Sequence, residues 1–278
     1  MHKTKGRYKL PNKINSGCSF EDAVKGFFVN NDLQIPDVFF YENTDSTNTR
    51  AKLYAENRDS DDRRPAIFFS HAQCAGRGTR GRTFESPAGG GVYISYLLCP
   101  EIEATSALSF TTYAAVSVCR AIKRITDRID PKIKWVNDIT VDGKKLSGIL
   151  TEGKIEDGKV RYAIVGIGVN VVAKEHSPEV AAIMTSLSDC GVDISPDEFA
   201  KTLTEEFFLG LQDIGSERML LEYKSYSSLL GKEVNISNFD GTKTELAIDI
   251  DEDFSLVTRD KDGQIHKYIS ADVTVRQK

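Results

Sequence analysis

Short apolar runs separated by polar, glycine-containing turns occupy residues 38–172 and predict the strands of a sheet. Two of these turns, Asp142-Gly143 and Asp157-Gly158, are Asx-Gly pairs between apolar runs, which is a strong signal for antiparallel hairpins. We therefore expect this half of the sheet to be antiparallel. The expected strands span residues 38–41, 66–69, 92–99, 132–136, 139–141, 146–150 and 160–172.

Apolar positions at helical spacing lie between and after these strands. Residues 106–126 carry such a pattern and stop before Pro131, which predicts one helix. A capping box over 195–198, with Pro at the first helical position, lies within a helical region that we expect over 178–230. We interpret both as scaffold. Shorter helices are expected at 20–29 and in a run that ends at Ala55.

From Lys232 onward the pattern changes to short alternating strands with Asp-Gly turns, which predicts a small closed barrel. The chain is thus expected to contain an N-terminal arm with a short helix (1–37), a large domain (38–230) and the barrel (231–278). The predicted fold class is α/β of the α+β type, in which a mixed, largely antiparallel sheet is accompanied by helices.

The stretch from Gln73 to Cys99 concentrates six glycines and three arginines between two apolar runs. Glycines allow backbone N–H groups to converge on one point, and guanidinium groups add fork-shaped donors. This composition favours an anionic ligand, such as a phosphate or a carboxylate. Taken alone, the same stretch is equally compatible with a solvated basic turn.

A polar segment, 42–48, follows the expected strand at 38–41. Asp45 or Ser46 is suited to cap the helix that comes next. The hydroxyl and amide groups of Ser46, Thr47 and Asn48 also stand at a strand end, where α/β sheets bind ligands. The two roles are compatible with each other.

Composition limits the classes of function. A formal net charge of −5 argues against a surface that binds nucleic acid throughout, so the basic loop is a local feature. The five cysteines are scattered and the four histidines dispersed, which argues against a disulfide framework, a zinc site or a Ser-His-Asp triad. The N-terminus has no apolar signal region and no run is long enough to span a membrane, so we expect a cytoplasmic protein.

Three segments together resemble the signature loops of biotin protein ligases. They are QCAGRGTRGR at 73–82, KWVNDITVDGKKLSGIL at 134–150 and GIGVN at 166–170. DSTN at 45–48 and a small barrel that ends in Val275-Arg276 also fit. Because only about one helix fits before residue 38, the resemblance is to the monofunctional type, which lacks an N-terminal helix-turn-helix domain.

The resemblance implies an α/β catalytic domain with an SH3-like C-terminal barrel, and a reaction in two steps. Biotin carboxylate attacks the α-phosphorus of ATP and releases pyrophosphate, with Mg²⁺ as activator. The ε-amine of one lysine on a biotin carboxyl carrier protein then attacks the carbonyl of biotinoyl-AMP. The implied partners are biotin, ATP and that carrier domain. No specific DNA or membrane partner is expected, and a homodimer remains open.

The resemblance also implies roles for individual residues. Lys145 and Arg77 would offset negative charge in the first step. Asp138 would either help to hold Mg²⁺ or take the proton of the incoming amine. The implied biotin-binding residues are Ser46, Thr47, Asn48, Gln73, Gly76, Arg77, Gly78, Thr79, Lys145 and Gly148. The implied ATP-binding residues are Arg80, Arg82, Lys134, Asn137, Asp138, Gly168, Asn170 and Arg276.

The sequence departs from the family pattern at three positions. Thr79 stands at the second arginine of the Gly-Arg-Gly-Arg loop, Phe84 where a Trp often follows, and Val136 within Lys-Trp-Pro-Asn-Asp. Thr79 bears most on function, because that arginine is associated with retention of the adenylate. Trp135, the only tryptophan, is a core anchor or a wall of the site, and we favour the core.

Two alternatives remain. A lipoate–protein ligase is similar in fold and mechanism, and the segment 88–93 superficially resembles its Gly-rich stretch. The Arg/Gly loop and Lys-Trp-Val-Asn-Asp favour biotin. A non-catalytic nucleic-acid-binding module would use the basic loop and the barrel, but the chain lacks a basic stripe interleaved with aromatic residues.

Overall fold

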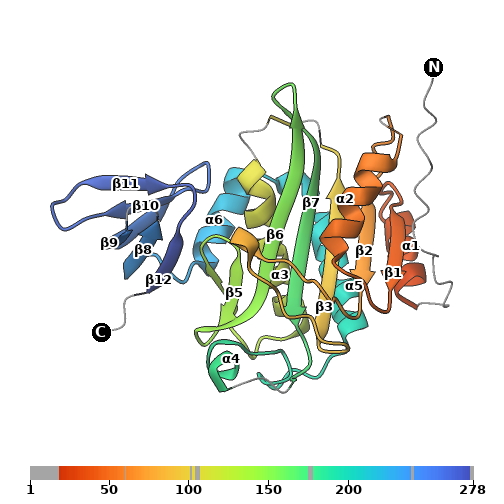
Figure 1. Ribbon diagram of the computed structural model, residues 1–278, viewed down its shortest axis with the longest axis horizontal. Helices are drawn as coiled ribbons and strands as arrows, with labels where there is room; N and C mark the ends of the chain where they lie inside the picture. The colour runs from red at the N-terminus through yellow and green to blue at the C-terminus, as the bar shows by residue number, and fades with distance from the viewer. Residues whose placement is uncertain are drawn as a thin grey trace.

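A computed structural model describes residues 19–59, 61–100, 102–103, 107–174, 178–238 and 241–275. It contains a seven-stranded sheet, a five-stranded sheet and helices around the larger sheet (Figure 1). This arrangement confirms the predicted fold class of a mixed sheet with helices. The C-terminal part, predicted as a small closed barrel, is a five-stranded antiparallel sheet.

The large sheet has the strand order β1-β2-β3-β7-β6-β5-β4. Strands β1 and β2 pair in parallel, and every other described pair in this sheet is antiparallel. Its strands are β1 (Asp37–Tyr41), β2 (Ala66–Ser70), β3 (Gly91–Leu98), β4 (Lys132–Lys134), β5 (Asp138–Val141), β6 (Lys144–Glu156) and β7 (Lys159–Asn170).

Both Asp-Gly hairpins are confirmed. Asp142 and Gly143 have φ values of 50° and 79°, and Asp157 and Gly158 have 51° and 77°, as a turn with two left-handed residues requires. The second hairpin differs from the expectation in length. Because each residue of the polar stretch 151–156 pairs with β7, strand β6 continues well beyond residue 150.

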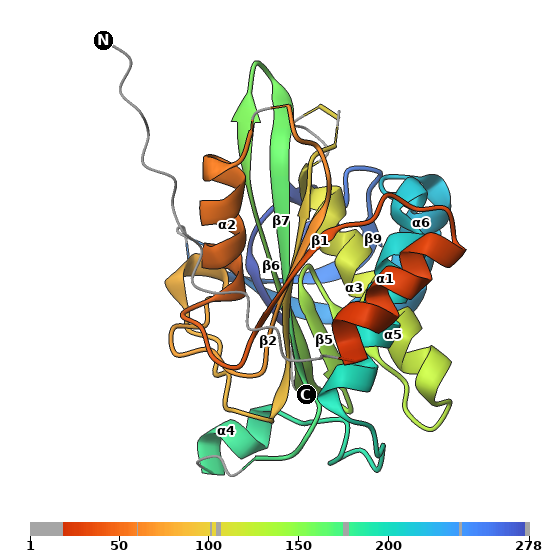
Figure 2. The same cartoon turned by 90° about the vertical axis from the view of Figure 1, so that its right-hand side faces the viewer.

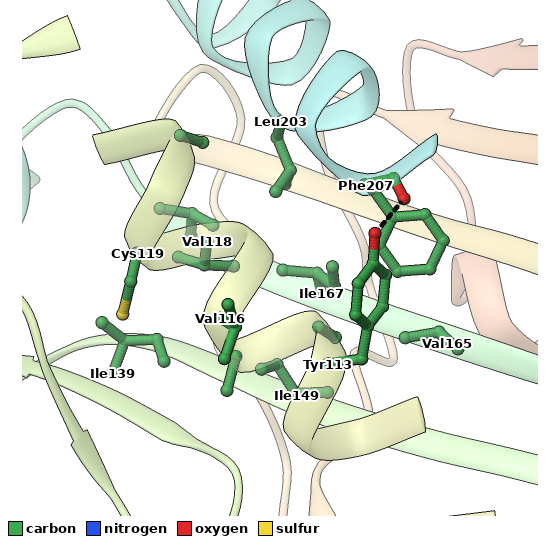
Figure 3. Close-up of a cluster of buried hydrophobic side chains, with 14 of the residues drawn as sticks. Tyr113, Val116, Val118, Cys119, Ile139, Ile149, Val165, Ile167, Leu203 and Phe207 are labelled. Carbon is green, nitrogen blue, oxygen red and sulfur yellow. Dashed lines mark hydrogen bonds between the residues drawn. The ribbon is translucent and has the colours of Figure 1, made fainter. Parts of the chain in front are cut away.

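Helices cover the two faces of this sheet unequally. Figure 2 shows α1, α3, α5 and α6 on one face and α2 alone on the other. The main hydrophobic core lies between the first face and its helices. Within it, Tyr113 of α3 donates a hydrogen bond to the carbonyl of Phe207 of α5 (Figure 3). The helices are α1 (Ser19–Asn30), α2 (Thr47–Asn57), α3 (Ala107–Ile125), α4 (Pro178–Ile183), α5 (Pro196–Leu209) and α6 (Glu217–Tyr226).

The helical region expected over 178–230 consists of three separate α-helices and a short 3₁₀ helix, Leu211–Asp213. Ser195 and Ser216 begin α5 and α6, and each accepts a hydrogen bond from the backbone N–H three residues on. The expected capping box is present, with the Glu198 side chain accepting from the Ser195 N–H. These caps interrupt the helical region that periodicity alone suggested.

The small sheet has the order β11-β10-β9-β8-β12 and is antiparallel throughout its described pairs. Its strand β12 lies beside the end of the large sheet that carries β5 (Figure 1). Its strands are β8 (Glu233–Asn238), β9 (Gly241–Ile250), β10 (Leu256–Arg259), β11 (Ile265–Tyr268) and β12 (Asp272–Val275).

Trp135 is both a core residue and a wall of a cavity, the two roles that the sequence left open. It is only 4% exposed and belongs to the main core, and its indole N–H donates to the carbonyl of Phe254 in the C-terminal part. The same residue also lines a cavity between the two sheets. Strand β4 stops at Lys134, short of the expected 136, and a cis peptide bond follows between Trp135 and Val136.

Among the described residues, no helix is long and apolar enough to cross a membrane. The four cysteines in the described part of the chain, Cys74, Cys99, Cys119 and Cys190, are free thiols, in agreement with the prediction. Cys18 lies outside the described residues.

His71 links three elements at the end of β2. Its Nε2 lies 2.8 Å from Asp197 at the start of α5, and its Nδ1 lies 3.3 Å from Glu42, just after β1. The rings of Phe40 and Phe69 meet it edge-on. The hydrogen bond with Asp197, followed by charge attraction and the contact with Glu42, raises the pKa of His71 above its usual value despite partial burial.

Stability should therefore depend on pH through His71. A raised pKa in the folded state stabilises the fold below the unfolded value of about 6.5, and this contribution is lost as pH rises through the folded value. We expect the difference in unfolding free energy between the wild type and His71→Gln to be larger at about pH 6 than at about pH 9. Urea unfolding at both pH values measures this free-energy difference. A difference that grows with pH would contradict a raised pKa of His71 in the folded state.

Candidate active site

Three glycines lie on the face of the large sheet that α2 covers, where the absence of side chains leaves a depression. Gly148 of β6 pairs with Gly168 of β7, and Gly166 lies two residues before Gly168 on the same face. The Phe84 ring lies directly on this floor, since a Cβ built on Gly168 would be 2.5 Å from it and one on Gly148 would be 3.2 Å away. Gly148 and Gly168 therefore have no room for a side chain while the Phe84 ring lies over them.

The glycine- and arginine-rich loop covers this floor and is folded back on itself. The Gly78 N–H donates to the Arg82 carbonyl at 2.7 Å, and the Phe84 N–H donates to the Gly76 carbonyl at 3.0 Å. Arg80 has a φ of 56°, in the left-handed region that non-glycine residues rarely adopt. The loop thus forms a compact turn, and its Arg80 and Arg82 pair with Asp272 of the small sheet.

A cavity of about 150 Å³ lies between the floor, the loop and β12. Lys145 crosses its floor, with Nζ 2.7 Å from Asp138 Oδ1 and 5.9 Å from the centre of the Phe84 ring. Eight of the predicted site residues line this cavity: Gly78, Thr79, Arg82, Lys134, Asn137, Asp138, Lys145 and Gly148.

Two adjacent lysines at the start of β6, Lys144 and Lys145, point their side chains in different directions. The Lys145 side chain lies over Gly148, and its backbone carbonyl accepts from the Thr185 N–H at 2.9 Å. Lys144 instead donates to the carbonyl of Ala181 in α4 at 3.1 Å. The two side chains therefore contact different parts of the protein, and of the two only Lys145 lines the cavity beside Asp138.

The start of α2 forms the other end of the site. Ser46 is the N-cap residue, as expected, but its side chain makes no capping hydrogen bond. The Gln73 side chain supplies the cap, because its Oε1 accepts from the Thr47 N–H at 2.8 Å. Its Nε2 donates to Ser86 at 2.9 Å, so both ends of the Gln73 amide have partners within the protein.

A buried chain of hydrogen bonds continues from Thr47 into the sheet. The Ser95 hydroxyl lies 2.7 Å from Thr47 Oγ1 and 2.6 Å from Asn48 Oδ1. Asn48 donates through Nδ2 to the Leu150 carbonyl at 3.2 Å and to Glu152 at 2.9 Å. Gly166 makes room for this amide, since a Cβ there would lie 2.0 Å from Asn48 Oδ1.

The loop arginines pair with carboxylates that the sequence analysis missed. Arg77 lies 3.0 Å from Glu152 of β6. Arg80 and Arg82 both bind Asp272 at the start of β12, at 2.5 and 3.0 Å. Each partner is separated from its arginine by at least 75 residues, so no local signal could have revealed the pairing.

The predicted ATP-binding residues do not all lie together: Arg82, Lys134, Asn137 and Asp138 line the first cavity, and Arg80 and Gly168 line neither this cavity nor the larger one around Asn170. Asn170 lines a second cavity of about 310 Å³ together with Lys144 and Lys174, and it donates to the Thr185 carbonyl at 3.1 Å. Gly168 lies beneath Phe84. Arg276 lies outside the described residues.

No group of three or more His, Cys, Asp or Glu side chains able to hold a metal ion occurs in the described part of the chain. Asp138 and Asp272 are the carboxylates that line the first cavity. Both carboxylates already pair with cationic side chains, Asp138 with Lys145 and Asp272 with Arg80 and Arg82.

Comparison with known proteins assigns this sheet, loop and lysine to a class of ligase. Residues 40–170 match the model of the Biotin/lipoate A/B protein ligase family. The biotin–[acetyl-CoA-carboxylase] ligase of Paracoccus denitrificans is 30% identical over 178 residues, which is 59% of this chain and 68% of that protein. The chain belongs to this family, among its biotin protein ligases.

Further similarities are of the same kind. The bifunctional ligase/repressor BirA of Bacillus subtilis is 33% identical over 213 residues, 74% of this chain. The chain spans 65% of the length of that relative. The structure of the biotin protein ligase from Aquifex aeolicus in complex with biotin and ATP is 27% identical, with a TM-score of 0.71, and the match covers 87% of this chain and 99% of that one.

Proposed function

We propose that this protein activates biotin with ATP and transfers it to a lysine of a biotin carboxyl carrier protein. In the first step a biotin carboxylate oxygen bonds to the α-phosphorus of ATP, and the bond to pyrophosphate breaks. In the second step the carrier amine bonds to the activated carbonyl, loses a proton, and AMP leaves. The proposal places this chemistry within residues 38–230, next to the small sheet.

The position of Lys145 is the observation that carries this proposal. Its ammonium group lies on a glycine floor under an arginine-bearing loop, 2.7 Å from Asp138. Joining a carboxylate to a phosphate brings two anions together, and a cation held in place beforehand lowers the cost of that approach. Lys134 and Arg82 line the same cavity and add to its positive charge.

The remaining residues divide by chemistry. The start of α2 offers neutral hydrogen-bonding groups, which suit an uncharged ring such as the ureido group of biotin. The cavity around Asn170 would take the nucleotide base. Mg²⁺ on the ATP phosphates would be met by Asp138 and would supply charge neutralisation.

The test is pyrophosphate release by the purified full chain with ATP and Mg²⁺, with biotin, lipoate or neither. We expect release with biotin and only background release with lipoate or ATP alone. Release that depends on lipoate would assign the chain to lipoate activation by the same mechanism. Absence of release with both acids would overturn the proposal.

Thr79 should weaken retention of the adenylate. Thr79 lines the cavity at the loop position where the family pattern has an arginine, and its uncharged hydroxyl cannot provide the ion-paired hydrogen bond to the phosphate that a guanidinium group would. We expect Thr79→Arg to slow biotinoyl-AMP release about tenfold, the effect of one such bond. Rapid filtration of the preformed complex measures the rate. Thr79→Gln, long but uncharged, serves as the control, and an unchanged rate in Thr79→Arg would refute the idea.

A further inference from the structure

The ring of Phe84 packs on the glycine floor of the site. It lies on the backbone of Gly148 and Gly168, and Lys145 Nζ is 5.9 Å from the ring centre. Tyr93 meets the ring edge-on, with the two centroids 6.3 Å apart. Among the residues that the structure describes, neither of the two hydrophobic clusters includes Phe84, which is half-buried. Its place on the floor is therefore a local contact of the loop, and the ring can leave it without opening the core.

The cavity beside this ring is too small for the proposed substrates. Its volume is about 150 Å³, whereas pockets that enclose a ligand of drug-like size measure about 300–1,000 Å³. The floor cannot recede, because Gly148 and Gly168 pair with each other in adjacent strands of the sheet. The side chain that covers these two glycines is Phe84, so movement of its ring would enlarge the cavity directly.

The backbone of the loop around Phe84 is held in place. The Phe84 N–H donates to the Gly76 carbonyl at 3.0 Å, and the Phe84 carbonyl accepts from the Ser86 hydroxyl at 3.0 Å. Two loop arginines also pair with Asp272 of the small sheet. Lifting the whole loop would break these contacts, whereas rotation of the side chain about its Cα–Cβ bond breaks none of them. Side-chain rotation is therefore the less costly way to expose the floor.

Phe84 also borders a space that can receive its ring. This space, the outer hollow, has a volume of about 360 Å³, more than twice that of the first cavity. The two cavities share Thr83 and Phe84 among their lining residues. The other residues that line the outer hollow are Gln73, Cys74, Gly76, Glu85, Ser86 and Pro87. One rotatable ring thus lies between a small covered cavity and a larger hollow.

We infer that Phe84 is a gate, whose ring covers the glycine floor until biotin arrives and then turns into the outer hollow. The inference rests on the proposed function and deepens it, because it names the residue that controls entry of the substrate ring. The phenyl ring and the fused rings of biotin compete for the same surface on Gly148 and Gly168. Departure of the phenyl ring also ends its contact with Lys145, so the ammonium group becomes available to the carboxylate only when the floor is open.

The position of the ring can be measured directly by NMR. In the full chain labelled in phenylalanine and glycine, we expect nuclear Overhauser contacts between the Phe84 ring and the α-protons of Gly168. Saturation with biotin should remove these contacts and replace them with contacts to the β-protons of Cys74. Contacts with Gly168 that persist at saturating biotin would overturn the inference.

Binding kinetics provide a second test. Trp135, the only tryptophan, lines the first cavity, so its fluorescence can report biotin binding in a stopped-flow experiment. Phe84→Ala removes the gate and should raise the association rate constant for biotin about tenfold, because the binding-competent fraction no longer limits binding. Phe27→Ala removes a half-buried ring of α1 that does not line the cavity, and this matched control should leave the rate constant unchanged.

Filling the outer hollow should have the opposite effect. Cys74 lines this hollow and is exposed, so Cys74→Phe would occupy the space that the Phe84 ring needs. We expect this variant to bind biotin about tenfold more slowly, and Cys74→Ser to bind it as the wild type does. Combining Cys74→Phe with Phe84→Ala should restore fast binding, because no ring then has to enter the hollow.

The possible outcomes separate the two proposals. A Phe84→Ala protein that binds biotin no faster than the wild type, or a double variant as slow as Cys74→Phe, would overturn the gate while an active wild type upholds the ligase function. Thermal unfolding of each variant identifies any loss of the fold, and the NMR measurement needs no substitution. A wild type that neither binds nor activates biotin would overturn the proposed function, and this inference with it.

Discussion

Replacement of Lys145 by alanine is expected to lower the rate of biotin-dependent pyrophosphate release by about 10²–10³-fold, the typical effect of removing one preorganised charge-stabilising group. The ammonium group lies 2.7 Å from Asp138 on the cavity floor, and Lys144 is directed to Ala181 and cannot replace it. The loss should appear in kcat as well as in kcat/KM, because the interaction strengthens as negative charge builds up on the α-phosphate.

Lys154→Ala is the matched control, because Lys154 pairs with Glu156 at the tip of the β6–β7 hairpin, outside the cavity. Lys145→Arg keeps the charge but changes its shape and reach, so it separates charge from placement. A Lys145→Ala enzyme within threefold of the wild type would remove Lys145 from the chemistry.

Replacement of Gly166 by alanine is the second change with a large expected effect. The new Cβ would lie 2.0 Å from Asn48 Oδ1, far inside any real contact distance, so the amide must move. Moving it breaks bonds to Ser95, Leu150 and Glu152 in a buried place. We expect about 1–3 kcal/mol of lost stability and a biotin KM raised at least about tenfold.

Gly26→Ala provides the matched control for this change. A Cβ at Gly26, on helix α1, would meet no atom within 4 Å, and alanine favours a helix by up to about 1 kcal/mol. Urea unfolding and biotin titration of both variants measure the two effects. If Gly166→Ala bound biotin as the wild type does, the Asn48 amide would not be part of the biotin site.

The fold was largely predictable because its elements carry local signals. The turns at 142–143 and 157–158 adopt the left-handed angles that Asp-Gly pairs favour, and Ser195 caps its helix in the expected box. Local patterns predicted the wrong length for strand β6 and missed the breaks in the helical region 178–230. The polar half of β6 is a strand because it pairs with β7. Residues 178–230 form three α-helices and a short 3₁₀ helix, and serine caps begin two of the α-helices.

The sequence predicted that several of the proposed site residues lie close together, but it did not predict which side chains pair. The resemblance placed Lys145, Asp138, Lys134 and Asn137 together, and one cavity contains all four. Which carboxylate binds which arginine depends on how distant strands come together: Glu152 lies 75 positions from Arg77, and Asp272 lies 190 from Arg82. A lone acidic residue in a strand gives no indication of such a partner.

The paired contacts of Asp272 with Arg80 and Arg82 affect how freely parts of this protein can be exchanged with those of relatives. A C-terminal sheet transplanted from another ligase would hold the arginine loop only if its last strand also began with a carboxylate. Chimeras should therefore be designed with the loop and the last strand taken from the same parent, as a single inherited unit.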